Sequence, residues 1–461
     1  MSATANRGLV RGVGVRGAVA INVITMVGIG PLITIPLVLR ALHGPLSLVG
    51  WIAGALLALC DGLVWAELGS RYPGSGGTYG FLREAFGRER LGRLLGFLFT
   101  WQTIFSAPLL VASGYIGFAS YAGYFSPALA ASSTAQAALA IAVGVVTLLA
   151  LYRGIGSVAR FASWLGVAAV VALLCVIAGG FAQFSPARAF ALEGDAFWPA
   201  LAAGFGQALI ITMYDYFGYG AASCVGDEVR DPARTLPRSI VISVLLVGAL
   251  YVAMQCGVLG AVPWRTIVAE HGIGQYIGSA VVERAFGGAA AAVVTVLILV
   301  TAFGSVYGNL LAFSRIPFAA AADGLFPRAF AHLHPRARFP DVSLLVIGLL
   351  ALPACLLSLG DVINALTTGM VLIQSVAQIV ALFALRRRGE RAPYRMWLFP
   401  LPALLALAGW LYAFGSAGTW PIAFGVLTLV CGTATYLALA RRGGRWPFPS
   451  RSPDEATLAR T

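Results

Sequence analysis

The chain has 461 residues, of which 59% are hydrophobic and 11% are charged, and it carries a formal net charge of +13. Its mean hydropathy of +0.85 excludes a soluble globular domain and indicates an all-α polytopic membrane protein. A strongly basic chain can bind nucleic acid, but the distribution of its arginines favours a different origin for the charge.

Twelve apolar stretches are long enough to cross the bilayer as transmembrane helices, since about 20 residues span the hydrocarbon core. In chain order they are residues 15–39, 46–70, 94–120, 134–152, 157–182, 198–222, 236–261, 288–320, 342–359, 362–385, 397–416 and 419–440. No cleavage site of small residues follows the first stretch, so we expect no removable signal peptide.

Glycines interrupt the first and the sixth of these stretches. The first contains Gly28-Ile29-Gly30 before a proline, and the sixth contains Gly218-Tyr219-Gly220 after a phenylalanine. A helix in lipid must satisfy its own backbone hydrogen bonds, so it unwinds only where the freed groups face protein, water or a ligand. Paired breaks in the two halves of a chain are typical of a transporter's substrate site.

The spacing of the breaks predicts an internal repeat. Gly28 and Gly218 lie 190 residues apart, as expected if helices 1–5 (15–182) and 6–10 (198–385) are structural repeats. Five helices reverse the orientation of the next five, so the second repeat is inverted. We therefore predict a cytoplasmic N-terminus (1–14), a ten-helix transport core (15–385), two peripheral helices (397–440) and a cytoplasmic tail (441–461).

The arginines, which account for all 31 basic residues, follow the predicted topology. If the N-terminus is cytoplasmic, 27 of them fall in or beside cytoplasmic segments, and the other four are Arg40, Arg188, Arg265 and Arg284. Such an excess on one side is what the positive-inside rule predicts. The basic charge therefore indicates a multi-pass protein of the inner (cytoplasmic) membrane with both termini in the cytoplasm, and no nucleic-acid partner.

Three stretches resemble the amino acid-polyamine-organocation (APC) superfamily of permeases. The first is AELGSRYPGSGGTY at 66–79, followed by FLREAFG at 81–87, and it is similar to the end of helix 2 in that family. The second is GDEVRDPARTLPR at 226–238, similar to the loop after helix 6, and the third is FSRIPFAAAADGLFP at 313–327, similar to the end of helix 8. The resemblance implies that substrate binds at the two breaks.

The chemistry of the two breaks suits an α-amino acid. Freed amides at the first break lie at the positive end of a half-helix and can bind a carboxylate. Freed carbonyls at the second break can accept an ammonium group. The substrate-binding residues expected there are Val27, Gly28, Ile29, Gly30, Phe217, Gly218, Tyr219 and Gly220.

Two positions in the sixth helix bear on the choice of substrate. Asp215 lies within one turn of the break, and because an intramembrane carboxylate is costly, we expect it to attract a cationic side chain or carry a proton. The alternative is a structural acid capped by the hydroxyl of Tyr214 or Tyr216. Tyr219 stands where many relatives carry an aromatic gate, and simple packing is its alternative role. Polyamine-selecting relatives place an acid at the next position, where this chain has Gly220, so the resemblance favours an amino acid.

Four residues are candidates for ion coupling or gating. Asp61 lies inside the second stretch, where burial favours a proton carrier or a hydrogen-bonded structural acid. Glu67, close to Arg71, is expected in a gating or structural ion pair. Ala302 and Ser305 are spaced like a sodium pocket of the family. We expect proton coupling in preference to sodium, and the lysine that some relatives use in helix 5 has no counterpart in this chain.

Further polar residues within the stretches can line a pathway or bond one helix to another. They are Trp101, Gln102, Ser106, Asn309, Gln374 and Gln378.

The sequence thus predicts a secondary transporter of a small molecule, an α-amino acid, that works without a cofactor. The alternatives are a permease for polyamines or other organic cations, a membrane-embedded sensor or enzyme, and a channel. All four histidines lie in loops, and no GxxxxGK[ST] nucleotide-binding motif occurs. The six cysteines lie in apolar stretches without a CxxC spacing, which predicts buried thiols and no disulfide or metal site.

Overall fold

The computed structural model describes residues 12–73, 77–153, 158–191, 197–269, 271–335, 339–389, 392–442 and 447–448. These residues form helices joined by turns, with an isolated β-bridge between Val13 and Val229. The expected all-α class is confirmed over these ranges. Residues 1–11 of the expected N-terminal segment, and 443–446 and 449–461 of the expected tail, lie outside the described residues.

The helices follow one another along the chain with few long connections. The longer ones are α1 (Val15–Met26), α2 (Gly30–Leu42), α3 (Ser47–Arg71), α5 (Gly92–Ala122), α7 (Ser133–Arg153), α8 (Val158–Ala182), α10 (Phe197–Tyr216), α12 (Pro232–Ala261), α16 (Gly288–Ala322), α17 (Asp341–Ala354), α18 (Leu359–Met370), α19 (Ala377–Arg387), α20 (Leu401–Ser416) and α21 (Thr419–Arg442). The shorter ones are α4 (Thr78–Phe86), α6 (Pro127–Ala130), α9 (Pro186–Ala189), α11 (Ala221–Cys224), α13 (Trp264–Ala269), α14 (His271–Gln275) and α15 (Ile277–Phe286). The π-helical turns are η2 (Gly87–Leu91) and η6 (Val371–Val376), and the 3₁₀ turns are η1 (Gly44–Leu46), η3 (Gly123–Phe125), η4 (Gly226–Glu228) and η5 (Arg328–Ala331).

Many of these helices have the length and hydropathy of membrane spans. Within the described residues seven helical stretches qualify, and α1 with α2, bent by 54° at the first break, count together as an eighth. α17 and α20 are apolar but shorter than a full span. The chain is therefore a multi-pass membrane protein, and the count of twelve helices stays a prediction.

The sixth predicted stretch, 198–222, is broken near its end and not at its middle. α10 is regular up to Tyr216, and after the break the chain forms only the four-residue helix α11. Gly218 lies at φ +119°, a conformation that stops a helix and that side chains disfavour. Because apolar residues continue through the glycines, hydropathy alone does not indicate where the helix ends.

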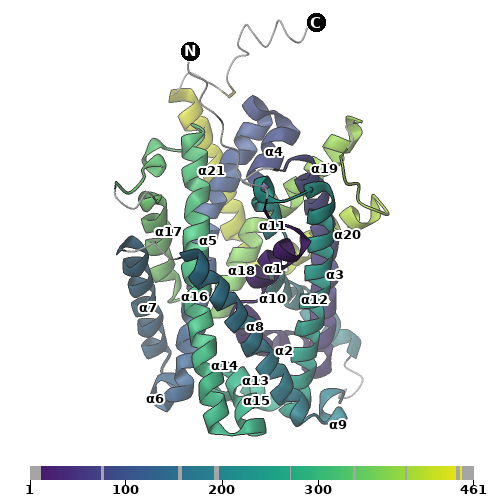
Figure 1. Cartoon of the computed structure of the whole chain (residues 1–461), viewed down its shortest axis with the longest axis vertical. Helices are drawn as coiled ribbons and strands as arrows, with labels where there is room; N and C mark the ends of the chain where they lie inside the picture. Colours follow the sequence, from purple (N-terminus) through teal and green to yellow (C-terminus); the bar gives the residue numbers. More distant parts are fainter. Residues whose placement is uncertain are drawn as a thin grey trace, which may run out of the picture.

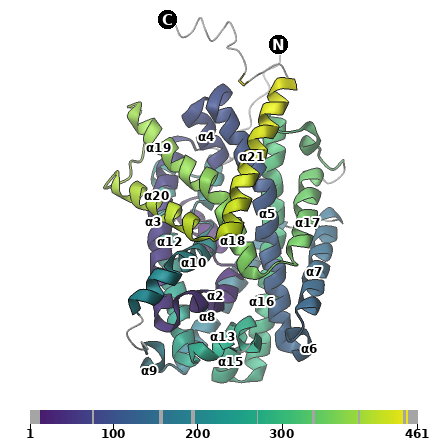
Figure 2. The same ribbon diagram turned by 180° about the vertical axis from the view of Figure 1, so that it is seen from behind.

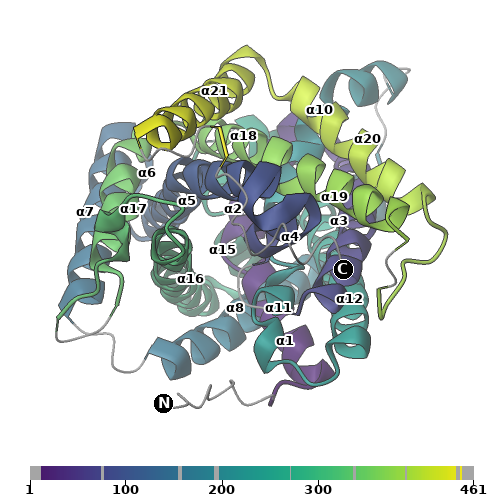
Figure 3. The ribbon, with the colours of Figure 1, turned by 90° about the horizontal axis from the view of Figure 1, so that it is seen from above.

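The helices form an elongated bundle with short helices at its two ends. α4 lies at one end with the last turns of α19 and α21, whereas α6, α9 and α13–α15 lie at the opposite end (Figures 1 and 2). Viewed along the long axis, α7, α17, α20 and α21 lie at the edge of the bundle, with α2, α5 and α18 inside it (Figure 3). The edge position of α20 and α21 agrees with their expected peripheral role.

Helices far apart in the sequence pack as pairs through small residues. α3 packs along α12, α5 along α16, and α2 along α10. α8 meets α12 where a Cβ on Gly180 would lie 2.6 Å from the carbonyl carbon of Gly257. Such close approach of two backbones is the usual way in which membrane helices associate.

The predicted burial of the six thiols is only partly correct. All six cysteines are free, and Cys60 and Cys355 are buried. Cys224, at the end of α11, and Cys431 of α21 are exposed, because an apolar stretch of sequence does not bury every residue in it.

The glycine contact between α8 and α12 gives a test of the packing. We expect Gly180→Ala to lower the free energy of unfolding by about 1–3 kcal/mol, because the new methyl group has no room beside the backbone of α12. The loss of stability is measured as a fall in the melting temperature of the purified protein in detergent. Gly415→Ala in α20 is the matched control, since a Cβ there meets no atom within 4 Å, and equal losses in the two variants would contradict the packing.

Candidate functional site

The first break turns the chain between α1 and α2. The amide of Val27 donates to the carbonyl oxygen of Val23 at 2.7 Å and ends α1, and the amide of Gly28 donates to the carbonyl oxygen of Met26 at 3.1 Å. α2 then begins at Gly30. The first amides of any helix have no partner within it and carry its positive dipole end, so the start of α2 can bind negative charge.

The second break lies directly against the end of α1. A Cβ on Gly218 would lie 2.8 Å from Cγ2 of Thr25 and 3.0 Å from the amide nitrogen of Met26. Only glycine permits both this approach and its positive φ. The two breaks, expected from the sequence to meet, are therefore in contact.

Tyr251 of α12 binds the backbone of both interrupted helices. Its hydroxyl lies 2.9 Å from the carbonyl oxygen of Met26 and 3.3 Å from that of Asp215. Asn22 of α1 supports the same region, because its side-chain oxygen accepts the amide of Ala222 at 2.9 Å. Neither residue was singled out by the sequence, where an isolated polar side chain in an apolar stretch has no visible partner.

Asp215 lies in the last turn of α10 and is buried, with its carboxyl group beside the start of α2. Its Oδ2 accepts a hydrogen bond from the hydroxyl of Thr34 at 2.6 Å, and its Oδ1 is buried without a hydrogen-bond partner among the described residues. A Cβ on Gly30 would lie 2.5 Å from that Oδ1. The start of α2, expected to be open to a substrate carboxylate, thus already faces a carboxyl group.

The capping of Asp215 differs from the structural alternative drawn from the sequence. Thr34 caps it, whereas the hydroxyl of Tyr214 pairs with Ser113 at 2.7 Å and that of Tyr216 donates to the carbonyl oxygen of Trp51 at 3.2 Å. Thr34 is four residues after Gly30, so it shares a helix face with the break. That spacing is the signal that could have identified it.

The aromatic ring beside the first break belongs to Tyr214. A Cβ on Gly30 would lie 3.2 Å from Cε1 of Tyr214. Tyr219, expected as the gate, instead donates from its hydroxyl to Oδ2 of Asp61 at 2.5 Å. Tyr219 is therefore bonded to α3, and Tyr214 is better placed to cover the break.

Gly220 packs against α3 as well. A Cβ at this position would lie 2.6 Å from Cε3 of Trp65. An acidic side chain at this position, which the resemblance associates with polyamine selection, would collide with this indole.

The two candidate coupling residues on α16 face the first break to different degrees. The hydroxyl of Ser305 would lie 3.1 Å from a Cβ on Gly28. Ala302 is fully buried one turn earlier, and the neighbouring hydroxyl of Thr301 is buried without a partner among the described residues. α16 thus brings Ser305 to the break, and Ala302 lies one turn before it.

Glu67 forms the expected ion pair with an unexpected partner. Its carboxylate accepts hydrogen bonds from Nε of Arg386 at 2.7 Å, from a second guanidinium nitrogen of the same arginine at 2.5 Å, and from the amide of Met396 at 2.8 Å. Its neighbour Arg71 donates to the hydroxyl of Tyr72. The ion pair therefore joins α3 to α19 across 319 residues, a separation that no local pattern reveals.

Two of the family-like stretches meet at the same end of the bundle. The hydroxyl of Thr78 donates to Gln378 of α19 at 2.6 Å. Asp323, at the end of α16, accepts from the hydroxyl of Tyr79 at 2.8 Å and from the guanidinium of Arg83 at 2.6 Å. α4 is thereby bonded to both α16 and α19.

The remaining pathway candidates lie on α5, α16, η6 and α19. The indole of Trp101 donates to the carbonyl oxygen of Thr428 in α21 at 2.9 Å, so it joins α5 to a peripheral helix. Gln102 is buried, and Asn309 of α16 is partly buried. Gln378 belongs to the contact with Thr78 described above.

Comparison with known proteins finds amino acid transporters. The family described as amino acid permease matches residues 14–439. A serine/threonine exchanger of Bacillus subtilis is 28% identical, over 95% of this chain and 99% of its own length. A branched-chain amino acid permease of the same organism is 25% identical, over 87% and 86%. The cationic amino acid transporter 4 of Mus musculus is 28% identical, over 75% of this chain and 55% of its own length.

The ion pair of Glu67 and Arg386 gives a second test. We expect Arg386→Met to lower the free energy of unfolding by about 3–5 kcal/mol, because it leaves a buried carboxylate unpaired. Adding Glu67→Gln should recover much of the loss, since the amide oxygen can still accept from Met396. Arg88→Met, which removes an exposed pair with Glu84, should change the melting temperature little. A double variant no more stable than Arg386→Met would contradict the role of the unpaired charge.

Proposed function

Because the chain belongs to the amino acid permease family, we propose that it is a secondary active transporter that moves an α-amino acid across the cytoplasmic membrane by alternating access. Its relatives are transporters of amino acids and not enzymes, which argues against the sensor or enzyme alternative. The observation that carries the proposal is the contact between the two helix breaks at Gly218 and the last turn of α1.

The breaks supply complementary partners for the two charges of an α-amino acid. The substrate carboxylate binds the amides of Ile29 and Gly30, because these groups stand at the positive end of α2. Val27 and Gly28 close α1 behind them, since their amides donate to the carbonyl oxygens of Val23 and Met26. The ammonium group binds the carbonyl oxygens of Phe217, Gly218 and Tyr219. Tyr214 covers the site from the side of α10, where its ring faces Gly30.

Asp215 carries the coupled proton in this proposal. Its Oδ1 lies against Gly30, so an ionised Asp215 and a substrate carboxylate would repel each other at the same helix start. A proton on Asp215 removes the repulsion, and substrate and proton then enter together. The other titratable groups facing this carboxyl are the hydroxyls of Tyr214, Tyr216 and Tyr251, which are neutral at physiological pH.

The substrate class follows from the same geometry. A neutral amino acid suits a site whose one acid is protonated, and the names of two relatives, a serine/threonine exchanger and a branched-chain permease, agree with it. A polyamine is disfavoured because Trp65 fills the space beside Gly220. Sodium coupling through Ala302 and Ser305 is the lesser alternative.

The twelve-helix inverted repeat belongs to the proposal and has two structural supports. The helices that would be equivalent, α3 with α12 and α5 with α16, pack along each other. In addition α4 and α15 precede α5 and α16, lie at opposite ends of the bundle (Figures 1 and 2), and both end in Ala-Phe-Gly with φ values of +85° at Gly87 and +86° at Gly287.

The arginines support cytoplasmic termini. The four predicted to lie outside are on α9, α13, α15 and the last turn of α2, and the first three of these helices lie at the end opposite α4 (Figure 1). The end with α4 is then cytoplasmic. There the bonds of Glu67, Thr78 and Asp323 form a closed cytoplasmic gate, which must open when the site turns inward.

Uptake by reconstituted protein tests the proposal. We expect saturable uptake of labelled serine, threonine or leucine into proteoliposomes, competed by neutral amino acids more than by lysine or putrescine. Gly30→Ala should reduce uptake at least about 10-fold, because the methyl group meets Asp215 and Tyr214. Gly415→Ala should transport normally. Absence of saturable uptake of any amino acid, or normal uptake by Gly30→Ala, would contradict the site.

Asp215→Asn tests the coupled proton. In the unaltered protein, affinity for a neutral amino acid should rise as the pH falls, because the protonated carboxyl binds substrate without repulsion. The amide cannot ionise and still accepts from Thr34, so binding to the variant should be independent of pH and uptake should not respond to a pH gradient. Asp361→Asn, at an exposed helix start, is the control. A persistent pH dependence would move the proton to another group, of which Asp61 is the first to test.

A further inference from the structure

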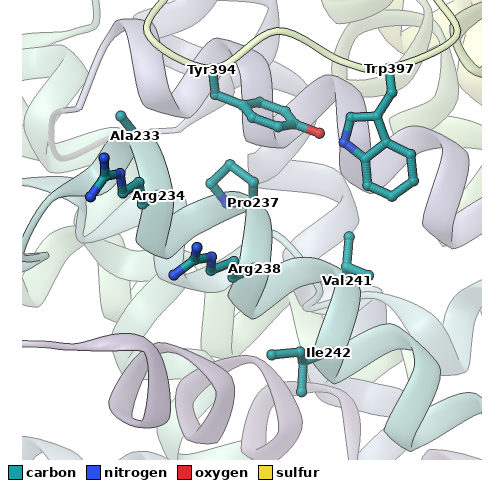
Figure 4. Close-up of a pocket in the computed structure, with 8 residues that line it drawn as sticks. All are labelled: Ala233, Arg234, Pro237, Arg238, Val241, Ile242, Tyr394 and Trp397. Atoms are coloured by element: carbon teal, nitrogen blue, oxygen red, sulfur yellow. The ribbon is translucent and has the colours of Figure 1, made fainter.

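A groove lies on the surface of α12 at the end that carries α4. It has a volume of about 370 Å³ and is lined on one side by Arg234, Arg238 and Ile242 of α12, and on the other by Tyr394 and Trp397 from the segment before α20. Figure 4 shows the two guanidinium groups extending to the same side of α12 and the two aromatic rings above that helix. None of the residues that line the groove is acidic.

Along one face of α12 the exposed residues change from charged to apolar. Arg234 and Arg238 are exposed and one turn apart, followed on the same face by Ile242 and Leu245, which are 46% and 58% exposed. Such a step from charged to exposed apolar residues marks the level at which headgroups give way to acyl chains. Trp397, 57% exposed, lies at this level, as tryptophans at membrane interfaces do.

The charge of the groove is positive. Nε of Arg234 lies 3.7 Å from Oδ2 of Asp231. Because both side chains are exposed, this ion pair leaves the guanidinium group open to a second partner. No ion pair involves Arg238 among the described residues. Two guanidinium groups one turn apart match the several oxygens of a phosphate group, which arginine binds with paired hydrogen bonds.

We propose that this groove is a binding site for an anionic phospholipid, with the headgroup phosphate on Arg234 and Arg238 and an acyl chain along Ile242 and Trp397. A free phosphate would share the arginines, but it would leave the apolar wall uncovered. The combination of basic groups with exposed apolar and aromatic residues at the interface therefore selects a lipid.

The groove is connected to the gate at the cytoplasmic end. The amide of Tyr394 donates to Ser70 of α3 at 3.4 Å, and the amide of Met396, one residue before Trp397, donates to Glu67. The wall of the groove is thus bonded to the carboxylate that pairs with Arg386. A bound lipid restrains this wall and so favours the closed gate, a consequence that rests on the proposed transport function.

Lipid binding is tested on the purified full chain, without any transport measurement. We expect native mass spectrometry to detect bound phosphatidylglycerol in preference to phosphatidylcholine, and phosphatidylglycerol in nanodiscs to raise the melting temperature above that in phosphatidylcholine. Arg234→Gln with Arg238→Gln should weaken phosphatidylglycerol binding by about 10- to 100-fold, as expected for the loss of charge-assisted hydrogen bonds. Because both arginines are exposed, this variant should melt like the unaltered protein in phosphatidylcholine.

Matched controls distinguish a lipid held in the groove from general electrostatic attraction and from a free anion. Arg88→Gln with Arg90→Gln removes the same charge from an exposed turn at the same end and should leave lipid binding unchanged; an equal loss would mean general electrostatic attraction. A shift with inorganic phosphate as large as that with phosphatidylglycerol would assign the site to a free anion. Equal binding of phosphatidylcholine by the unaltered protein would also overturn the proposal. None of these outcomes depends on whether the protein transports an amino acid.

Discussion

The structure depends on how backbone groups released inside a membrane protein find partners. At each break a helix stops within the bundle, where an unpaired carbonyl or amide costs several kcal/mol. Tyr251 contributes at both breaks, because its one O–H group lies within hydrogen-bond distance of a carbonyl oxygen at the end of α1 and of one at the end of α10, and is shared between them. The need to pair these backbone groups disfavours a break inside the membrane, and here it also holds the two breaks together through Tyr251.

Glycine has two separate roles at these breaks. At Gly218 it allows a positive φ and the close approach of α1. At Gly30 it keeps the carboxyl group of Asp215 at the start of α2, where any side chain would displace it. The second role explains how a buried acid is tolerated: Oδ2 of Asp215 accepts a hydrogen bond from Thr34 and the carboxyl group faces the positive end of a helix. Its Oδ1, which has no hydrogen-bond partner among the described residues, remains for a proton or a ligand.

The sequence could predict the features that depend on composition and local pattern. Hydropathy predicted the multi-pass helical class, and the glycine pairs predicted the two breaks and their meeting. It could not assign partners across long separations, so neither the pairing of Glu67 with Arg386 nor the hydrogen bond from Tyr219 to Asp61 was predicted. The helical register of Tyr214 and Tyr219 relative to Gly30 depends on the exact residue at which α10 ends, and the hydropathy, which continues through the glycines, does not mark that residue.

α3 connects the two functional regions. Asp61 bonds to Tyr219 at the second break, and Glu67, six residues later, bonds to Arg386 and Met396 at the end of the bundle that carries α4. Six residues of a helix span about 9 Å, and α3 is regular throughout this part, so α3 can carry movement from one region to the other. In the proposed transport cycle, a substrate that shifts Tyr219 would act on the same helix that the proposed gate holds. Met396, which donates to Glu67, belongs to the segment that lines the surface groove, so α3 is the element that the broken helices, the ion pair and the groove have in common.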